Sequence, residues 1–143
     1  MMDKAGRSRE LNIDALPDNL ETVISMIDEI LSEADASPKV QMPVELAVEE
    51  IFVNIAHYAY PEGTGQVGVR ACISEDGKVF SVSFTDSGVP YDPLAREDPD
   101  VTLSAEERKI GGLGVFLTKK LMDDVRYEYR DGQNILELFK NLT

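Results

Sequence analysis

The chain has 143 residues, the size of one domain with one hydrophobic core, so a single domain over residues 1–143 is expected. Its 27 acidic and 14 basic residues give a formal net charge of −13, and such a surface repels phosphate backbones, which excludes nucleic acid as a general partner. The single cysteine, Cys72, excludes a disulfide within the chain, and the sequence has neither a membrane-length apolar run nor a signal peptide, so a cytoplasmic protein without membrane contact is expected.

A strand and two helices are predicted in the first half of the chain. Residues 10–14 are typical of a short strand, and Asp18 is expected to cap a helix that Pro38 would stop. The apolar residues of this helix recur at helical spacing: Leu20, Val23, Ile24, Ile27, Ile30 and Leu31. Pro43 suits the first turn of a second helix, which should end before Pro61.

The second predicted helix contains the stretch EEIFVNIAHYAY, residues 49–60, which has polar side chains on one face. Glu50, Asn54 and His57 follow one another at spacings of four and three, which stack side chains on one side of a helix. The opposite side is an apolar stripe of Val44, Val48, Ile51, Phe52, Ile55 and Ala59. Further apolar residues flank the polar ones: Leu46, Ala47 and Val53. The polar face is therefore either an ordinary solvated face or the floor of a cleft.

Alternating residues predict two β-hairpins. The first pairs residues 65–74 with residues 78–86, and the second spans residues 125–140 with a turn at the Asp-Gly pair 131–132. Between the hairpins come a long aperiodic loop and a helix over residues 115–123. The order strand, helix, helix, hairpin, loop, helix, hairpin predicts an α+β sandwich of two layers, with the helices on one face of an antiparallel sheet.

Small motifs stand at both ends of the long loop. Asp86 directly follows a predicted strand, and Gly88 comes two residues later. At the other end Gly111, Gly112 and Gly114 lead into a helix, whose N-terminus offers unpaired N–H groups and a positive dipole to an anion such as phosphate. Each motif has a plain structural alternative, because Asp86 can bond its own backbone in a turn and the glycines can form an ordinary helix cap.

Three stretches, EEIFVNIAHYAY, DSGVPYDP and GGLGVFLTKKLMD, occur in this order, and in them the chain resembles the GHKL ATPase superfamily, which includes gyrase, the histidine kinases and MutL. They are similar to the superfamily's Asn-containing box and its two glycine boxes. The greatest similarity, over about residues 10 to 140, is to stand-alone anti-sigma-factor serine/threonine kinases of the RsbW type. Pro90 stands where many members have a second glycine, which fits this stand-alone branch. The resemblance implies a Bergerat fold with a mixed, mostly antiparallel sheet, and ATP held beneath a mobile lid.

The resemblance also implies a role for each matching residue. Glu50 matches the general base, which accepts the proton of an attacking hydroxyl, and Asn54 matches the ligand of Mg²⁺. Glu49 points about 100° away around the helix, so only Glu50 has the four-residue offset from Asn54. Asp86 matches the residue that accepts a hydrogen bond from the adenine amino group, and Gly88 leaves room for the base.

The remaining matches concern the phosphates and the lid. The phosphate-binding turn is implied for Gly111, Gly112, Leu113 and Gly114. Lys109 is expected either to neutralise phosphate charge or to be a solvated residue of the lid, which corresponds to residues 92–110. Thr118 is expected either to contact a phosphate or a water or to be a packing residue. His57 either borders the phosphate site or is a structural histidine.

The expected function is that of an ATP- and Mg²⁺-dependent serine/threonine protein kinase. The resemblance implies a STAS-type anti-anti-sigma protein as its substrate, and it allows a sigma factor and a second copy of the chain as further partners. The alternative is a nucleotide-responsive protein-binding module without phosphoryl transfer, and a third possibility is a slow ATPase whose turnover only moves the lid. Glu50 favours the kinase, because a protein without catalysis would have little need of a base there. The acidic surface is compatible with protein docking in either case.

Overall fold

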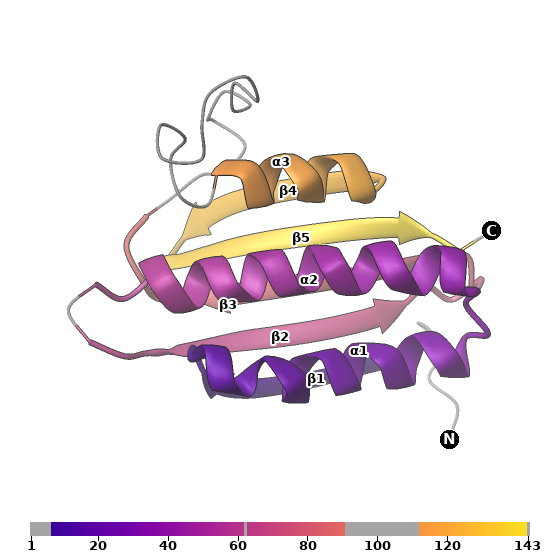
Figure 1. The fold of residues 1–143 in the computed structure, drawn as a ribbon, viewed down its shortest axis with the longest axis horizontal. Helices are drawn as coiled ribbons and strands as arrows, with labels where there is room; N and C mark the ends of the chain where they lie inside the picture. The colour runs from indigo at the N-terminus through magenta and orange to yellow at the C-terminus, as the bar shows by residue number, and fades with distance from the viewer. Residues whose placement is uncertain (1–6, 62, 91–111, 143) are drawn as a thin grey trace.

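The computed structural model describes residues 7–61, 63–90 and 112–142, and of residues 112–116 it describes the backbone alone (Figure 1). The elements in chain order are β1 (Arg7–Asp14), a 3-10 turn (Pro17–Asn19), α1 (Leu20–Glu33), α2 (Pro38–Tyr58), β2 (Gln66–Ile73), β3 (Val79–Asp86), α3 (Gly112–Leu121), β4 (Asp124–Arg130) and β5 (Gln133–Asn141). The predicted order of elements is confirmed over these residues.

The five strands form one sheet in the order β1-β2-β3-β5-β4, and all four pairings are antiparallel. Figure 1 shows α1, α2 and α3 side by side on one face of this sheet, with α2 in the middle. The predicted α+β sandwich of two layers is therefore confirmed. The expectation of a mixed sheet is not met among the described strands, because none of their pairings is parallel.

The core lies between the sheet and the three helices. The apolar stripe predicted on the second helix is buried against the sheet, and Val44, Val48 and Phe52 are fully inaccessible to solvent. Alternate residues of the central strands face the stripe: Val67, Val69, Ala71, Ile73, Phe80, Val82, Phe84, Leu136 and Leu138. In the described part of the chain, no helix combines the length and apolarity that crossing a membrane requires.

The start of the first helix differs from the prediction. The α-helix begins only at Leu20, after a 3-10 turn that Pro17 opens, so Asn19 rather than Asp18 occupies the N-cap position. The side-chain amide of Asn19 donates a hydrogen bond to the carbonyl of Asp14 at 2.9 Å, which ties the helix start to the end of β1. That strand itself begins at Arg7, three residues before the predicted start.

The start of the second helix was also predicted wrongly. Pro38 does not stop a helix but starts α2, and Pro43 lies inside α2 rather than in its first turn. Ser37 takes an extended backbone at the N-cap, and a proline suits the next position because no helical partner exists there for a backbone N–H. At Pro43 the helix loses one hydrogen bond, and the burial of the stripe that begins at Val44 compensates for that loss.

The two described ends of the chain lie together, at the end of the sandwich opposite the C-terminus of α2 (Figure 1). Arg7 pairs with Ile73 at the end of β2. The backbone N–H of Leu142 donates to the carbonyl of Lys78 at 2.8 Å. Both ends therefore lie beside the turn that joins β2 to β3.

The turn between β4 and β5 has the geometry that its sequence predicts. Asp131 has a φ of 54° and Gly132 a φ of 79°, and a two-residue hairpin turn with both central residues at positive φ follows the twist of the strands. Gly132→Ala should lower the free energy of unfolding by about 1–2 kcal/mol, because a side chain at this φ is strained. Urea denaturation measures the change.

The matched control is Gly63→Ala, because a Cβ at Gly63 would meet no heavy atom within 4 Å and its φ is not positive. This variant should be as stable as the native protein or slightly more stable. If the two substitutions had equal effects, the turn would not depend on a glycine.

Candidate functional site

Three elements that carry predicted site residues, α2, β3 and α3, meet β5 at one end of the sandwich. The C-terminus of α2, the end of β3, the start of β5 and the N-terminus of α3 all lie at the end remote from the chain termini (Figure 1). Two contacts join these elements directly. Asp86 pairs with Asn134 across β3 and β5, and the backbone N–H of Val89 donates to the carbonyl of Ala59, after α2, at 3.0 Å.

Asp86 is the last residue of β3, and its side chain is only 6% exposed. The carboxylate oxygen Oδ1 accepts hydrogen bonds from the backbone N–H of Gly88 at 2.9 Å and from the side-chain amide of Asn134 at 3.0 Å. Among the described residues, no donor reaches the second oxygen, Oδ2. The turn-type bond predicted as the structural alternative is thus present, and it leaves one carboxylate oxygen for a ligand.

Gly88 lies directly against the end of α2. A Cβ at this position would come within 2.2 Å of the carbonyl oxygen of Ala59 and 2.7 Å of its carbonyl carbon, which no side chain tolerates. Only glycine therefore lets the loop after β3 approach the helix and form the Val89–Ala59 hydrogen bond. The structure explains this glycine by helix packing, and its expected role of giving room to a purine stays a prediction.

Glu50 and Asn54 lie one turn apart on α2, where the spacing places them on one side of the helix. Both side chains are half-buried, whereas Glu49 is exposed, as its different position around the helix requires. His57 is also exposed, and its ring contacts that of Tyr58 with 6.0 Å between the centroids. The polar face is therefore partly covered at Glu50 and Asn54 and solvated at His57.

The residues expected to bind phosphate are described only in part. Lys109, Gly111 and the lid, residues 92–110, lie outside the described residues. The backbone shows that α3 begins three residues earlier than predicted, so Gly112, Leu113 and Gly114 form its first turn. The N–H groups of a first turn have no partner within the helix, so they are available to an anion.

Two further observations concern the burial of Thr118 and the side chains that could hold a metal ion. Thr118 is 1% exposed, which favours its packing role over a contact with phosphate. Among residues 7–61, 63–90 and 112–142, no three His, Cys, Asp or Glu side chains lie close enough together to hold a metal ion.

Asn134 is a site residue that the sequence did not reveal. Its side chain is 7% exposed, and its amide nitrogen donates to Asp86 and, at 2.9 Å, to the carbonyl of Val89. Its amide oxygen accepts a hydrogen bond from the hydroxyl of Tyr127. One signal was present, because Asn134 is a polar residue at an inward position of a strand whose next inward residues are Leu136 and Leu138.

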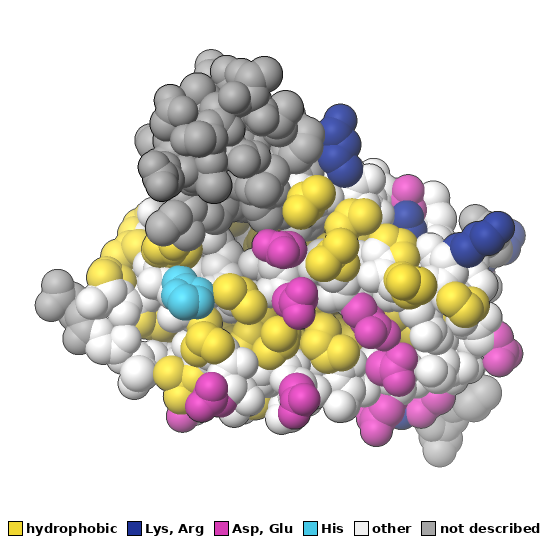
Figure 2. Space-filling view, viewed as in Figure 1, with side chains coloured by type: hydrophobic (Ala, Val, Ile, Leu, Met, Phe, Trp, Pro, Cys, Tyr) yellow, Lys and Arg dark blue, Asp and Glu magenta, His cyan; other side chains and the backbone are white. Residues whose placement is uncertain are grey.

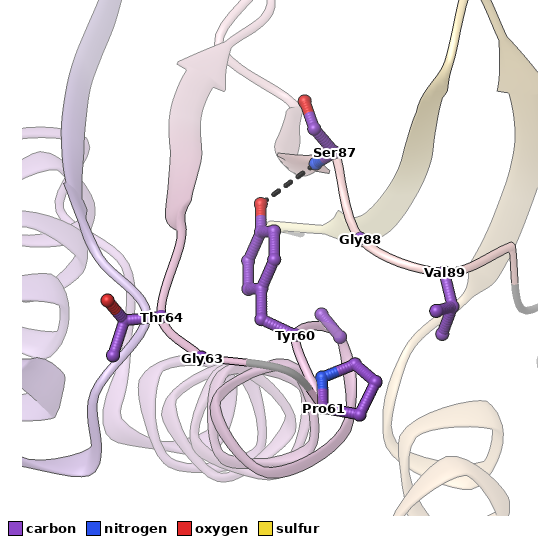
Figure 3. A pocket seen from close by; sticks show the side chains of 8 residues that line it. Tyr60, Pro61, Gly63, Thr64, Ser87, Gly88 and Val89 are labelled. Carbon is purple, nitrogen blue, oxygen red and sulfur yellow. Dashed lines mark hydrogen bonds between the residues drawn. The ribbon is translucent and has the colours of Figure 1, made fainter.

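Tyr60 is the second residue that sequence reasoning missed. Its hydroxyl donates to the carbonyl of Gln66 at 2.6 Å. The same hydroxyl accepts a hydrogen bond from the backbone N–H of Ser87 at 2.9 Å (Figure 3). It thus joins the chain after α2 to the start of β2 and to the residue after β3. The pKa of Tyr60 lies above its ordinary value. Burial is the largest cause, the charge of Asp86 adds to it, and the hydrogen bond from Ser87 opposes both.

A cavity of about 410 Å³ adjoins this tyrosine (Figure 3). One wall is the chain that follows α2, which includes Tyr60, Pro61 and Thr64, and the other is the loop from Ser87 to Val89. The cavity is open to solvent and lies beside the backbone of Gly88, whereas the side chain of Asp86 does not line it.

Sequence comparisons relate the chain to ATPase domains and protein kinases. Residues 13–140 match the family described as the histidine kinase-like ATPase domain. The serine-protein kinase RsbW of Listeria monocytogenes is 31% identical over 131 residues, which cover 88% of this chain and 82% of that protein. The serine/threonine-protein kinase BtrW of Bordetella bronchiseptica is 26% identical over 102 residues, which cover 71% of each chain.

Two solved structures share the fold. The RsbU and RsbW domains of a Mycobacterium tuberculosis protein align with a TM-score of 0.64 and 20% identity, over 94% of this chain but only 32% of that one, so this chain spans about a third of its length. A chain of the SiaB–SiaC complex from Pseudomonas aeruginosa aligns with a TM-score of 0.55 and 20% identity, over 92% of this chain and 89% of that one.

Tyr60→Phe should lower the free energy of unfolding at neutral pH by about 1–2 kcal/mol, because the backbone groups of Gln66 and Ser87 lose a partner. The folded-state pKa of Tyr60 lies above the ordinary value of 10.0, so folding favours the neutral hydroxyl. The stabilisation is therefore fully present below pH 10.0 and is lost as the pH rises through the folded-state pKa.

Urea denaturation of the native protein and of Tyr60→Phe at neutral and at strongly alkaline pH measures their difference in free energy of unfolding. This difference should be smaller at high pH. Tyr58→Phe is the control, since Tyr58 is the last residue of α2, is 42% exposed and should tolerate the change. Equal stability of native protein and Tyr60→Phe at neutral pH would show that the two hydrogen bonds contribute nothing.

Proposed function

The chain belongs to the family of histidine kinase-like ATPase domains, and we propose that it is a protein kinase that transfers the γ-phosphoryl group of ATP to a serine or threonine of a STAS-type protein. The names of its relatives support transfer to a hydroxyl of a protein. A sigma factor and a second copy of the chain are further partners that the proposal includes.

The nucleotide half of the proposal rests on Asp86. Its carboxylate is buried, held by two donors on Oδ1, and has Oδ2 left over. A bound purine would cover Oδ2, and an acceptor that is covered needs a donor, which the amino group of adenine supplies. Guanine carries a carbonyl oxygen at the same ring position, so it would leave the carboxylate oxygen unpaired. The residues present therefore fit adenine and disfavour guanine.

The transfer half of the proposal rests on α2. ATP supplies the phosphoryl group, which leaves the β-phosphate oxygen as ADP departs and forms a bond to the hydroxyl oxygen of the protein substrate. Glu50, which is half-buried on the polar face of α2, accepts the proton of that hydroxyl. Asn54 would hold Mg²⁺ through its amide oxygen, a neutral ligand of the type that this ion accepts beside phosphate oxygens.

The same helix offers a surface for the protein partner. Figure 2 shows hydrophobic side chains next to Asp and Glu on the face that carries the helices. Met42 is 71% and Leu46 40% exposed, and they precede Glu50 by two turns and one turn. Glu45 shares a hydrogen bond with Asp28 of α1, and burial and this neighbour raise the pKa of Glu45. A partner with apolar and basic groups would suit this surface, and it would bring its hydroxyl near the base.

The chain should bind ATP more tightly than GTP, by roughly 5- to 150-fold, because an unmade hydrogen bond at a buried acceptor costs about 1–3 kcal/mol. Asp86→Asn should narrow this difference, since an amide can donate to the guanine oxygen. Calorimetric titration of both proteins with the two nucleotides, in the presence of Mg²⁺, measures it. Equal affinities of the native chain for ATP and GTP would contradict the role of Asp86.

Glu50→Gln should slow phosphoryl transfer by about a hundred- to ten-thousand-fold and leave ATP affinity nearly unchanged, because the amide keeps the shape of the side chain but takes no proton. The assay follows labelled phosphate from ATP into STAS-type proteins of the same organism. Glu49→Gln is the matched control, as the neighbouring residue on the exposed side of the helix, and should transfer at the native rate.

Native transfer rates in Glu50→Gln would remove Glu50 as the base. A native chain that binds ATP and changes its affinity for a partner with the nucleotide, yet transfers no phosphate, would be a nucleotide-responsive binding module. ATP hydrolysis without any transfer would point to an ATPase instead.

A further inference from the structure

Three side chains from three different strands form a continuous hydrogen-bonded row. The hydroxyl of Tyr127 in β4 donates to the amide oxygen of Asn134 in β5, and the amide nitrogen of Asn134 donates to Asp86 at the end of β3. We propose that Tyr127 and Asn134 are positioning residues that set the preference for adenine by orienting the carboxylate of Asp86. This inference rests on the proposed function, in which Asp86 binds the purine.

The row has a defined direction. An asparagine side chain has one acceptor oxygen and one NH₂ donor group. The donor group of Asn134 faces two acceptors, the carboxylate of Asp86 and the carbonyl of Val89, at 3.0 and 2.9 Å. A flipped amide would place its oxygen against both of them, which is repulsive. The hydroxyl of Tyr127 then provides a donor for the amide oxygen on the other side, so both the oxygen and the nitrogen of the Asn134 amide have partners.

Burial makes the row hard to replace with water. Asn134 is 7% and Asp86 is 6% exposed, so a polar group that loses its partner there stays unpaired or moves. The terminal torsion of an aspartate is broad and roughly two-fold, so the carboxylate by itself has no fixed plane. With the amide of Asn134 and the N–H of Gly88 both on Oδ1, the plane is set and Oδ2 is the oxygen presented to a ligand.

Asn134 also fixes the chain beside the ligand. Its amide holds the carbonyl of Val89, while the N–H of the same residue is bound to the carbonyl of Ala59. The loop that leaves β3 is therefore attached to β5 on one side and to the end of α2 on the other. A change in the row would alter both the acceptor for the purine amino group and the backbone next to it.

The test compares ATP with purine riboside triphosphate, which is ATP without the amino group. A change that merely loosens the fold would weaken both ligands alike, whereas loss of positioning weakens ATP alone. Tyr127→Phe should reduce the preference for ATP by roughly three- to tenfold, the size of one neutral hydrogen bond, and leave the affinity for the analogue unchanged. Asn134→Ala should reduce the preference further.

Tyr129→Phe is the matched control, because Tyr129 lies in the same strand, is 46% exposed and should keep the native ratio. If Asn134→Ala fails to fold, as its thermal melt would show, Tyr127→Phe still decides the question, since it removes one atom from a partly exposed ring. An unchanged ratio in Tyr127→Phe, with the native chain still preferring ATP, would overturn the positioning role and leave the proposed function intact. A native chain that binds neither ligand would overturn both.

Discussion

Asp86 places a carboxylate at the almost fully buried end of β3, and burying a carboxylate is costly unless hydrogen-bond donors reach it. The architecture of this end of the molecule answers that need from two directions. The antiparallel register of β3 and β5 places Asn134 opposite Asp86, and the turn after β3 brings back the N–H of Gly88. That turn brings Gly88 against the carbonyl of Ala59, the residue that follows α2, and a side chain at position 88 would collide with it. The hydrogen bonds of Asp86 thus connect β3 to β5 and to the loop after β3, and this loop in turn contacts the end of α2.

Recognition and transfer are divided between the two layers of the sandwich. The groups assigned to the purine belong to strands and to a loop tied down at both sides, and such groups move little relative to one another. The groups assigned to the phosphoryl transfer, Glu50 and Asn54, project from the middle helix on the opposite layer. The exposed apolar residues Met42 and Leu46 belong to that same helix, so the base and the docking surface proposed for the partner share one rigid element.

Much of the fold could be predicted from the sequence, because its signals are local. The apolar stripe of α2, the alternation of β2 and β3 and the Asp131–Gly132 turn each depend on residues close together in the chain, and all three are confirmed. The start of α2 was missed because a proline suits a first turn and a break equally well. Pro38 was expected to stop a helix but opens α2, and Pro43 was expected in the first turn but lies inside the helix.

The site was predictable to a smaller degree. Asp86 could be singled out as a candidate, because an acidic residue directly after a strand is a local pattern, and its role stays a prediction. Its partner Asn134 is 48 residues away, and only the strand order β3-β5 brings the two together. Tyr60 was overlooked for the same reason, since its bond to Ser87 spans 27 residues. The roles of Lys109 and Gly111 stay predictions, because both residues lie outside the described part of the chain.

The position of the chain ends has a practical consequence. Arg7 and Leu142 lie beside the turn between β2 and β3, while Asp86 and Asn134 lie at the other end of the same strands. An eight-residue strand is roughly 25 Å long, so Arg7 and Leu142 lie about that far from the proposed purine site. Immobilisation through a label at Arg7 or Leu142 would therefore leave the end of the domain that carries Asp86 facing solution.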